Sequence, residues 1–312
     1  MFGYLVRGWP LRYMRRWPVR ARTPLARVDA SVYGSLVKPK DLTIVTLFRI
    51  GAAWTLGLLL ALPAGAADIV SHRGIYDLKL SAARQGGAFV DARGGLDMTI
   101  EKTCDGWLLT QDLGMELATA QGAEVRQLIR YSGWESLDGR RYRFVSRTQT
   151  GADQKESRGQ ARVGDSDLSG EAIFQAPKPQ TVKLPPGTRF PIAHAAWLID
   201  RALAGEHQAP SVVFDGTDGE GPQNVTAFIG RKVGATEHEY GRGAIGALAQ
   251  RDGWTMRLAF FAEGSRDASP EYEMEIFQLA NGVAPRMVVD YRDFSVVLDI
   301  RKIEPIAAPN CS

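Results

Sequence analysis

Strict alternation of apolar and polar side chains is the pattern that most constrains this chain, and it recurs from residue 71 almost to the C-terminus. In one segment Leu96, Met98 and Ile100 alternate with Asp97 and Thr99. A period of two places successive side chains on opposite faces of a strand, so that one face is buried and the other is solvated. The pattern predicts half-buried antiparallel strands, because parallel strands are usually buried on both faces.

Glycine-containing dipeptides separate many of the alternating segments and offer the positive φ angle that tight hairpins need. They are Gly94-Gly95, Asp105-Gly106, Asp138-Gly139, Asp215-Gly216, Asp252-Gly253 and Asn281-Gly282. About a dozen strands joined in this way predict a mainly β protein, in which a single large antiparallel sheet is coiled or barrel-like.

One segment departs from the strand pattern. Pro185-Pro186-Gly187 interrupts the strands, and Ala195 and Ile199 then recur at helical spacing. Gly205 suits the C-terminal cap of a helix. We therefore expect one main helix from Ile192 to Ala204, packed against the sheet.

The N-terminal part of the chain carries an export pattern. Arg49 precedes the apolar run Ile50–Leu62, and the small residues Ala64-Gly65-Ala66 follow it. This order predicts a signal peptide at residues 43–66 that is cleaved after Ala66. An uncleaved anchor is the alternative, although a membrane span needs about 20 strongly apolar residues.

Residues 1–42 form a basic extension that makes the signal longer than the usual 15–30 residues or so. A translation start near Lys38 to Leu47 would explain this length. Residues 1–66 carry 10 basic and 2 acidic side chains, which leaves a net charge of −5 for residues 67–312. We expect residues 67–312 to form the exported domain. Its acidity argues against nucleic-acid binding, which needs a positive surface.

Cys104 and Cys311 are the two cysteines of the chain. An even number in an exported protein favours a disulfide, because the compartments outside the cytoplasm are oxidising. Two buried free thiols are the alternative. A bond closing a loop of roughly 200 residues would stabilise the fold by at most about 5 kcal/mol. Two cysteines without a clustered histidine do not make a structural zinc site, so no metal site is expected.

Motifs of common enzymes are absent from the sequence, including G-x-S-x-G, H-E-x-x-H, a phosphate loop and a dinucleotide fingerprint. His194 opens the predicted helix, where a charge or capping role is favoured over catalysis. Glu271, Glu273 and Glu275 predict a solvated strand face. We therefore expect no catalytic residue and no cofactor. Four tryptophans are interpreted as core side chains or, alternatively, as the lining of an apolar ligand cavity: Trp107, Trp134, Trp197 and Trp254.

Eight segments occur in an order that carries a family resemblance. They are His72–Leu78, Cys104–Trp107, Trp134–Gly139, Leu184–Pro191 followed by His194, Val213–Gly216, Pro270–Glu273, Asn281–Val283 and Cys311. Together they resemble the cell envelope integrity protein EipB family of alphaproteobacteria. The resemblance extends from Ser71 to Cys311.

The resemblance implies a periplasmic protein folded as a β-spiral, or incomplete barrel, with a helix against it. It implies a disulfide between Cys104 and Cys311, and it carries no catalytic residues. Family members are associated with envelope integrity and with a periplasmic tetratricopeptide-repeat partner. The leading hypothesis is a non-enzymatic periplasmic protein that maintains the envelope through protein–protein interaction.

Two other functions are weighed against this hypothesis. The first is a carrier or sensor that binds a lipid, lipoprotein or lipopeptide in the concave face of the sheet. The second is a hydrolase with a non-standard site that uses His194 or Glu273.

Overall fold

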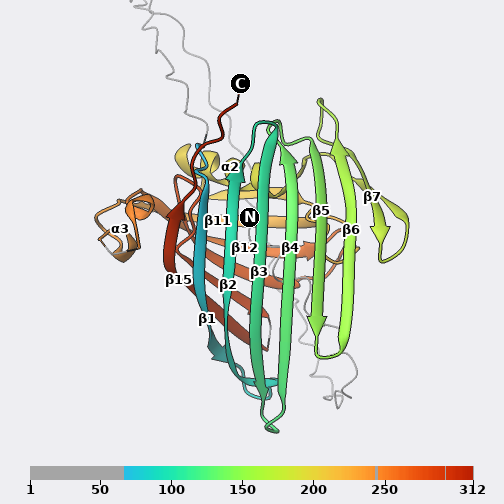
Figure 1. The fold of residues 1–312 in the computed structure, drawn as a ribbon, viewed down its shortest axis with the longest axis vertical. Coiled ribbons are helices and arrows are strands. Elements are labelled where there is room, and N and C mark those ends of the chain that lie inside the picture. The colour runs from blue at the N-terminus through green and yellow to red at the C-terminus, as the bar shows by residue number, and fades with distance from the viewer. Residues whose placement is uncertain (1–66, 243–244, 292, 312) are drawn as a thin grey trace, which may run out of the picture. The chain divides into compact units, whose positions relative to one another are not determined.

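The computed structural model describes residues 67–242, 245–291 and 293–311, which are built around one 15-stranded sheet (Figure 1). The N-terminal half contains β1 (His72–Ala83), β2 (Phe89–Lys102), β3 (Gly106–Thr119), β4 (Glu124–Ser136), β5 (Arg141–Thr150), β6 (Asp153–Val163), β7 (Gly170–Ala176) and β8 (Gln180–Leu184). The C-terminal half contains β9 (Thr188–Arg189), α2 (Pro191–Leu203), β10 (Gln208–Val213), β11 (Gln223–Val233), α3 (Glu239–Arg242), the 3-10 helix η2 (Ala247–Ala249), β12 (Gly253–Ala262), β13 (Tyr272–Leu279), β14 (Arg286–Tyr291) and β15 (Phe294–Pro305). The predicted mainly β fold with one large sheet is confirmed.

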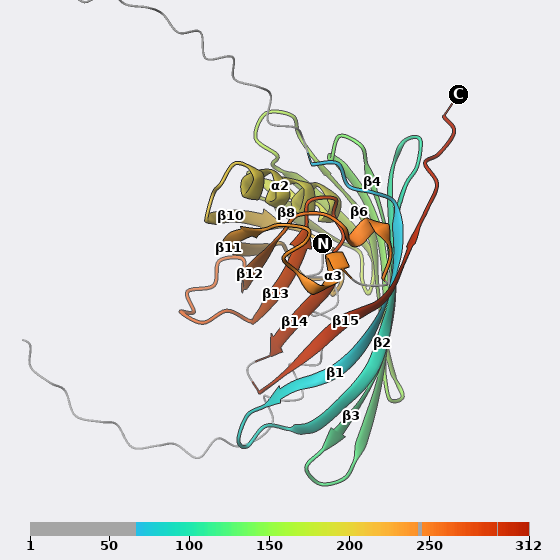
Figure 2. The ribbon, with the colours of Figure 1, turned by 90° about the vertical axis from the view of Figure 1, so that its left-hand side faces the viewer.

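The sheet consists of two meanders joined at the middle, in the order β8 to β1 and then β15 to β9. The first and last strands pair at the centre, in a ladder that runs from His72↔Pro305 to Ala83↔Phe294. We call this ladder the central seam. The two edge strands come from the middle of the sequence, where Pro185–Gly187 alone separates β8 from β9. The sheet curves round on itself, so it is barrel-like and nearly closed (Figure 2).

The neighbouring strands pair antiparallel, with the exception of β9 and β10, which pair parallel. Hairpins can join antiparallel strands, whereas a parallel pair needs a longer crossover, usually through a helix. Helix α2 supplies that crossover between β9 and β10. This connection places α2 at the open edge of the sheet that β9 forms.

Apolar side chains that alternate along the strands line the concave side. Leu96, Met98 and Ile100 of β2 are each at most 2% exposed. Tyr76 of β1 lies opposite Leu96, and Leu109 of β3 lies opposite Ile100. Burial of side chains of this size contributes roughly 1.5–3 kcal/mol each, which makes this face the hydrophobic core.

The glycine dipeptides do not all form turns. Gly139 and Gly282 have positive φ angles, of +67° and +88°, in connections between neighbouring strands. Gly94 and Gly95 lie inside β2, so the turn predicted there is wrong. A Cβ atom at Gly94 would lie 2.1 Å from the carbonyl oxygen of Gly114 on β3. These glycines permit close approach of two backbones, which is the other common use of glycine within strands.

Helix α2 begins one residue before the predicted start, at Pro191, and it ends at Leu203. Its buried face includes Ile192, Ala195 and Ile199. Gly205 follows with a φ angle of +77°, as predicted for the cap. The helix lies at one end of the sheet, beside β10 (Figure 2).

No helix in the described residues is long and apolar enough to cross a bilayer. The expected extension at residues 1–42, the signal peptide at residues 43–66 and the cleavage after Ala66 lie outside the described residues. They remain predictions.

Candidate functional site

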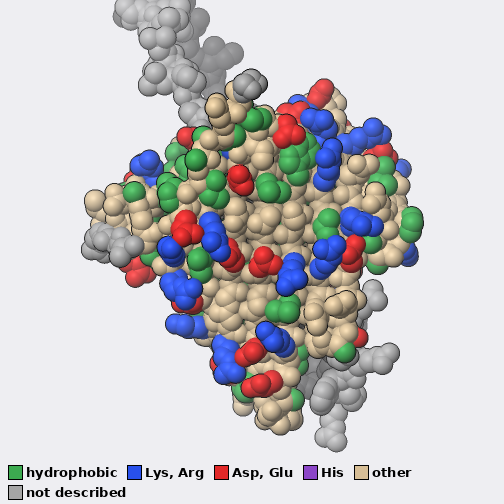
Figure 3. Space-filling model, in the orientation of Figure 1, with side chains coloured by type: hydrophobic (Ala, Val, Ile, Leu, Met, Phe, Trp, Pro, Cys, Tyr) green, Lys and Arg blue, Asp and Glu red, His purple; other side chains and the backbone are tan. Residues whose placement is uncertain are grey.

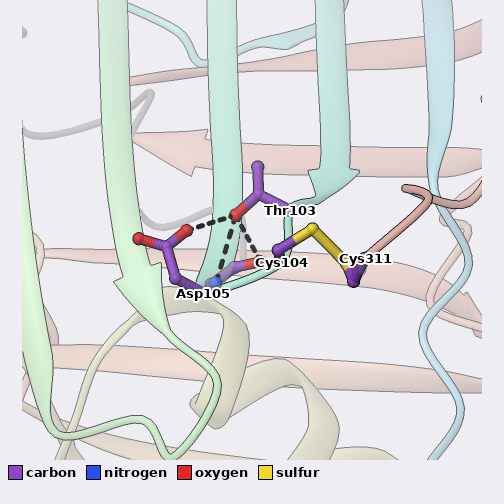
Figure 4. Close-up of a disulfide and its surroundings, with 5 residues drawn as sticks. Thr103, Cys104, Asp105 and Cys311 are labelled. Atoms are coloured by element: carbon purple, nitrogen blue, oxygen red, sulfur yellow. Dashed lines mark hydrogen bonds between the residues drawn. A yellow bond between two sulfur atoms is a disulfide. The ribbon is translucent and has the colours of Figure 1, made fainter.

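A disulfide links Cys104 to Cys311 across 207 positions of sequence, with the two Cα atoms 5.5 Å apart (Figure 4). Cys104 lies in the short turn between β2 and β3, and Cys311 lies in the tail that follows β15. Thr103 shapes the turn, because its hydroxyl donates to Asp105 Oδ1 at 2.9 Å and accepts from the Gly106 N–H at 3.1 Å. Both cysteines are exposed, so the bond is open to solution.

The disulfide reinforces the central seam at one of its ends. The pairs His72↔Pro305, His72↔Ile100 and Lys102↔Trp107 bring the end of β15, the start of β1 and the β2–β3 turn together. Cys104 and Cys311 therefore join the two meanders covalently, beside the ladder that joins them by hydrogen bonds. The loop closed by the bond contains most of both meanders.

The opposite junction, between the edge strands β8 and β9, is held by side chains. Glu135 at the end of β4 accepts hydrogen bonds from the backbone N–H groups of Ile192 and Ala193 on α2, with distances of 2.7 and 2.8 Å. The residue at the N-cap of α2 is Phe190, which has no side-chain oxygen to offer. Glu135 therefore caps a helix that belongs to the other meander, 57 positions further along the chain. This bridge between the halves is called the Glu135–α2 cap.

Burial governs the protonation of Glu135, which is 2% exposed. Burial raises the pKa of its carboxyl group to about 7, although the two N–H donors act to lower it. The positive end of the helix dipole and the two donors still provide a fitting environment for the charge. The cap thus joins a structural role to a group that titrates near neutral pH.

His194 lies on the same turn of α2 and is 1% exposed. Its Nε2 atom lies 3.0 Å from Ser211 Oγ on β10. Burial, with the neighbouring charge of Arg189 adding to it, holds the pKa of His194 well below its usual value. The imidazole is therefore neutral at pH 7. The charge or capping role expected for His194 is wrong, because the neutral side chain contacts Ser211 and fixes α2 on β10 instead.

Aromatic rings fill the space between the two edges. Phe214, just after β10, packs against Phe144 and Phe174 of the N-terminal meander, with ring centroids 5.7 and 5.9 Å apart. Tyr142 stacks on Phe190 at 5.0 Å. These five rings form what we call the aromatic cluster, and it replaces the missing β-ladder between the edges.

The loop after Phe214 completes this contact. Tyr142 donates a hydrogen bond to the carbonyl oxygen of Asp215 at 3.1 Å, and Ser157 donates one to that of Gly216 at 2.6 Å. Gly216 has a φ angle of +70°, as predicted for a turn. The loop is nevertheless buried, whereas Asp215-Gly216 was expected to form a tight hairpin.

The four tryptophans differ in whether they are buried as expected. Of the four tryptophans, Trp254 is buried at 3%, whereas Trp107, Trp134 and Trp197 are half-buried, so the core interpretation is wrong for these three. Indole rings have a large apolar surface and a polar N–H, which suits a partly covered site. The guanidinium of Arg189 lies over the Trp197 ring at 4.3 Å.

The glutamates alternate with inward side chains of β13, and Glu275 pairs with Arg257 across the sheet at 3.6 Å. Glu273 is half-buried on the same face as Glu275, while His194 is buried between α2 and β10. No described contact joins Glu273 to His194. Within the described residues, no group of three or more His, Cys, Asp or Glu side chains could hold a metal ion.

Glu135 lies inside the segment Trp134–Gly139, and its capping role is not predicted from the sequence. One signal was present, because Phe190 and Pro191 precede the predicted helix start at Ile192, and neither is a Ser, Thr, Asp or Asn that could cap it. A helix with no local cap needs an acceptor from elsewhere. The sequence does not tell which distant residue supplies it.

Charged side chains of both signs are scattered over the face of β1–β7 that Figure 3 shows. Several form ion pairs between neighbouring strands, among them Arg93–Glu116, Arg147–Glu156 and Arg162–Glu171. This face has mixed charge rather than the single-sign field that attracts nucleic acid.

Comparison with known proteins identifies the family. The model of the EipB-like family matches residues 63–307, which include every strand of the sheet. The chain belongs to the EipB-like family. The resemblance stated from the sequence is thereby confirmed.

Two relatives of the EipB-like family are informative. The cell envelope integrity protein EipB of Brucella abortus (strain 2308) is 26% identical over 238 residues, which cover 75% of this chain and 83% of that protein. A crystal structure from Brucella abortus, described as a beta-barrel-like protein of the domain of unknown function DUF1849, has a TM-score of 0.71 and 25% identity. That match covers 78% of this chain and all of the other. The family name thus refers to cell envelope integrity.

Proposed function

We propose that this protein maintains cell envelope integrity as a non-enzymatic protein of the periplasm, acting through contact with another protein. Membership of the EipB-like family carries the proposal. Export, with removal of residues 1–66, brings the domain to the compartment in which it works.

The disulfide supports the location. Cys104 and Cys311 are exposed, and an exposed disulfide in the cytosol would be subject to reduction by the thiol pool there. The periplasm is oxidising, so the bond forms and persists after export. A protein whose two meanders are tied in this way also keeps its shape where no ATP-driven chaperone restores it.

The expected partner is a periplasmic tetratricopeptide-repeat protein, as the family resemblance implies. Such repeats stack into a superhelix with a long concave binding surface. The mixed-charge face of β1–β7 (Figure 3) suits a polar interface in which charge complementarity sets specificity. Binding would be measured between the purified domain and purified periplasmic repeat proteins of the same organism.

The cellular test uses deletion and complementation. We expect loss of the gene to sensitise cells to detergent and to cell-wall antibiotics, and the wild-type gene to restore resistance. A Cys104→Ser/Cys311→Ser variant should restore it less well, in proportion to its loss of folded protein. Normal resistance in the deletion strain under every envelope stress would overturn the proposal.

A second candidate function is a carrier or sensor for a lipid, lipoprotein or lipopeptide, and two buried polar groups favour it. Gly74, Met98 and Gln111 lie side by side on β1, β2 and β3, and the ring of Tyr76 covers Gly74. The Tyr76 hydroxyl and Gln111 Oε1 are buried without a hydrogen-bond partner among the described residues. A polar ligand head group in the concave face would satisfy them.

Native mass spectrometry of protein purified gently from the periplasm distinguishes the two candidates. A stoichiometric extra mass in the range of a lipid or lipopeptide would support the carrier, and a Gln111→Leu variant should then lose that mass. A bare polypeptide mass would support the protein-contact function.

A further inference from the structure

The first described residue of the chain is held by a single acidic side chain. The backbone nitrogen of Ala67 donates a hydrogen bond to Asp200 Oδ1 at 2.8 Å, across 133 positions of sequence. Asp200 lies in the last turn of α2 and is half-buried. Ala67 is also the residue that follows the cleavage site predicted from the sequence.

The residues after Ala67 fix its position. Ile69 is buried at 6% and packs on Gly282, where an added Cβ atom would lie 3.0 Å from Ile69 Cγ2. The Val70 N–H donates to the carbonyl oxygen of Asn281 at 3.0 Å. Ile69 and Val70 follow Ala67 by two and three residues, so their contacts place the backbone nitrogen of Ala67 beside Asp200.

Asp200 is unusual at its place in the helix. The C-terminal end of a helix carries a partial negative charge, which disfavours an acidic side chain there. No Lys or Arg within the described residues forms an ion pair with Asp200, and its neighbour Arg201 pairs with Glu206 at 2.8 Å. A cation close to Asp200 would therefore offset two unfavourable terms, the helix dipole and the partial burial of the carboxylate.

We propose that Asp200 is the binding site for the new α-ammonium group of Ala67, which forms when the chain is cut between Ala66 and Ala67. Hydrolysis of that peptide bond consumes one water molecule and leaves a carboxylate on Ala66 and an ammonium group on Ala67. The amide N–H that donates to Asp200 becomes a charged donor at the same position. Processing thereby strengthens a contact between the start of the mature chain and α2.

This contact has a structural consequence. The N-terminus of the mature domain is attached to the same helix that Glu135 caps, so both ends of α2 are then held by groups from outside the C-terminal half of the chain. The inference rests on the export and processing in the proposed function. It concerns the folded domain alone, so it fails or succeeds separately from the role in the envelope.

The test compares two N-termini in two backgrounds. One form begins with a free Ala67, released from a cleavable fusion, and the other keeps Gly65-Ala66 in front of it. Each form is made with Asp200 and with Asp200→Asn, and thermal unfolding is followed by circular dichroism. We expect the free Ala67 terminus to raise Tm by about 2–4 °C with Asp200, and by less than half of that with Asp200→Asn. Equal changes in the two backgrounds would overturn the proposal.

A chemical readout separates ion pairing from simple packing. An ammonium group paired with a carboxylate loses its proton less readily, and the unprotonated amine is the species that reacts with acylating reagents. At neutral pH we expect acylation of the Ala67 amine to be several-fold slower with Asp200 than with Asp200→Asn. Equal rates, or a mature terminus other than Ala67 in exported protein sequenced from its N-terminus, would refute the assignment.

Discussion

Breaking the Cys104–Cys311 bond should destabilise the domain strongly, and the size of the effect follows from the structure. A crosslink across 207 positions removes about 5 kcal/mol of conformational entropy from the unfolded chain in the loop-closure treatment. Residues 307–311, however, make no described backbone hydrogen bond, so the tail regains freedom in the folded protein when the bond is reduced. This freedom offsets part of the stabilisation, and disulfides in proteins typically contribute about 2–4 kcal/mol. We expect a net loss of about 3 kcal/mol.

The assay is thermal unfolding of the purified domain with and without reductant. For a chain of this size, 1 kcal/mol corresponds to a Tm shift of about 2–4 °C, so a loss of about 3 kcal/mol should lower Tm by roughly 6–12 °C. The Cys104→Ser/Cys311→Ser variant is the matched control. It should melt at the temperature of the reduced wild type and should not respond to reductant. The double change is preferred, because either single change leaves one exposed thiol free to form dimers.

Two results would contradict this reasoning. A Tm that changes by less than 2 °C on reduction would mean that the unfolded chain gains little conformational entropy when the loop is opened. Alternatively, it would mean that the freedom regained by the tail in the folded protein offsets the whole loss of stability. An equal loss of Tm when the double variant is treated with reductant would mean that the reductant acts elsewhere.

Three further predictions concern the junction between the sheet edges. Burial raises the pKa of Glu135 to about 7 in the fold, above its usual 4.5, so its contribution to stability is full below pH 4.5 and is lost as pH rises through 7. Relative to Glu135→Gln, the unfolding free energy of the wild type should increase by about 2–3 kcal/mol from pH 8 to pH 5. A pH-independent difference between the two proteins in denaturant titrations would refute this prediction. Gly216→Ala should lower the unfolding free energy by at least about 2 kcal/mol in the same assay, because its Cβ atom would lie 2.5 Å from the Phe144 ring at a residue with a positive φ angle. The control Gly122→Ala has a positive φ angle and open space around it, so it should lower the unfolding free energy by only about 1–2 kcal/mol. Equal losses would show that the Phe144 ring moves aside. Phe214→Ala should cost about 3–5 kcal/mol by opening the aromatic cluster, and a cost below 1 kcal/mol would show that the edges are held without it.

The sequence predicts the fold class well because its signal is local. The alternation of Leu96, Met98 and Ile100 reports a strand with one buried face, whatever lies beside it. The same reasoning locates α2 to within one residue at each end, because its apolar spacing and Gly205 are local too. It misses strands that are too short to show a period, such as the two-residue β9.

The candidate site depends on contacts between distant residues, and these are where prediction from the sequence ends. Glu135 and α2 meet because the two meanders curve towards each other, and no pattern near Glu135 records that. Trp134 is taken for a core residue on composition, yet it points outward with Arg143 at 5.0 Å from its ring. In both cases the identity of the residue is clear from the sequence, and its surroundings are set by the curvature of the whole sheet.

The central seam constrains the order in which the protein can fold if it is exported as proposed. Strand β1 would then enter the periplasm first, yet its partner β15 would be among the last segments to arrive, so the ladder between them could not form until nearly the whole domain had crossed the membrane. Until then β1 presents an unpaired edge, which is a site for aggregation. Pairing between strands so far apart in sequence also slows folding. The newly exported chain should therefore need the protection of periplasmic chaperones, and formation of the disulfide reports that the last strand has docked.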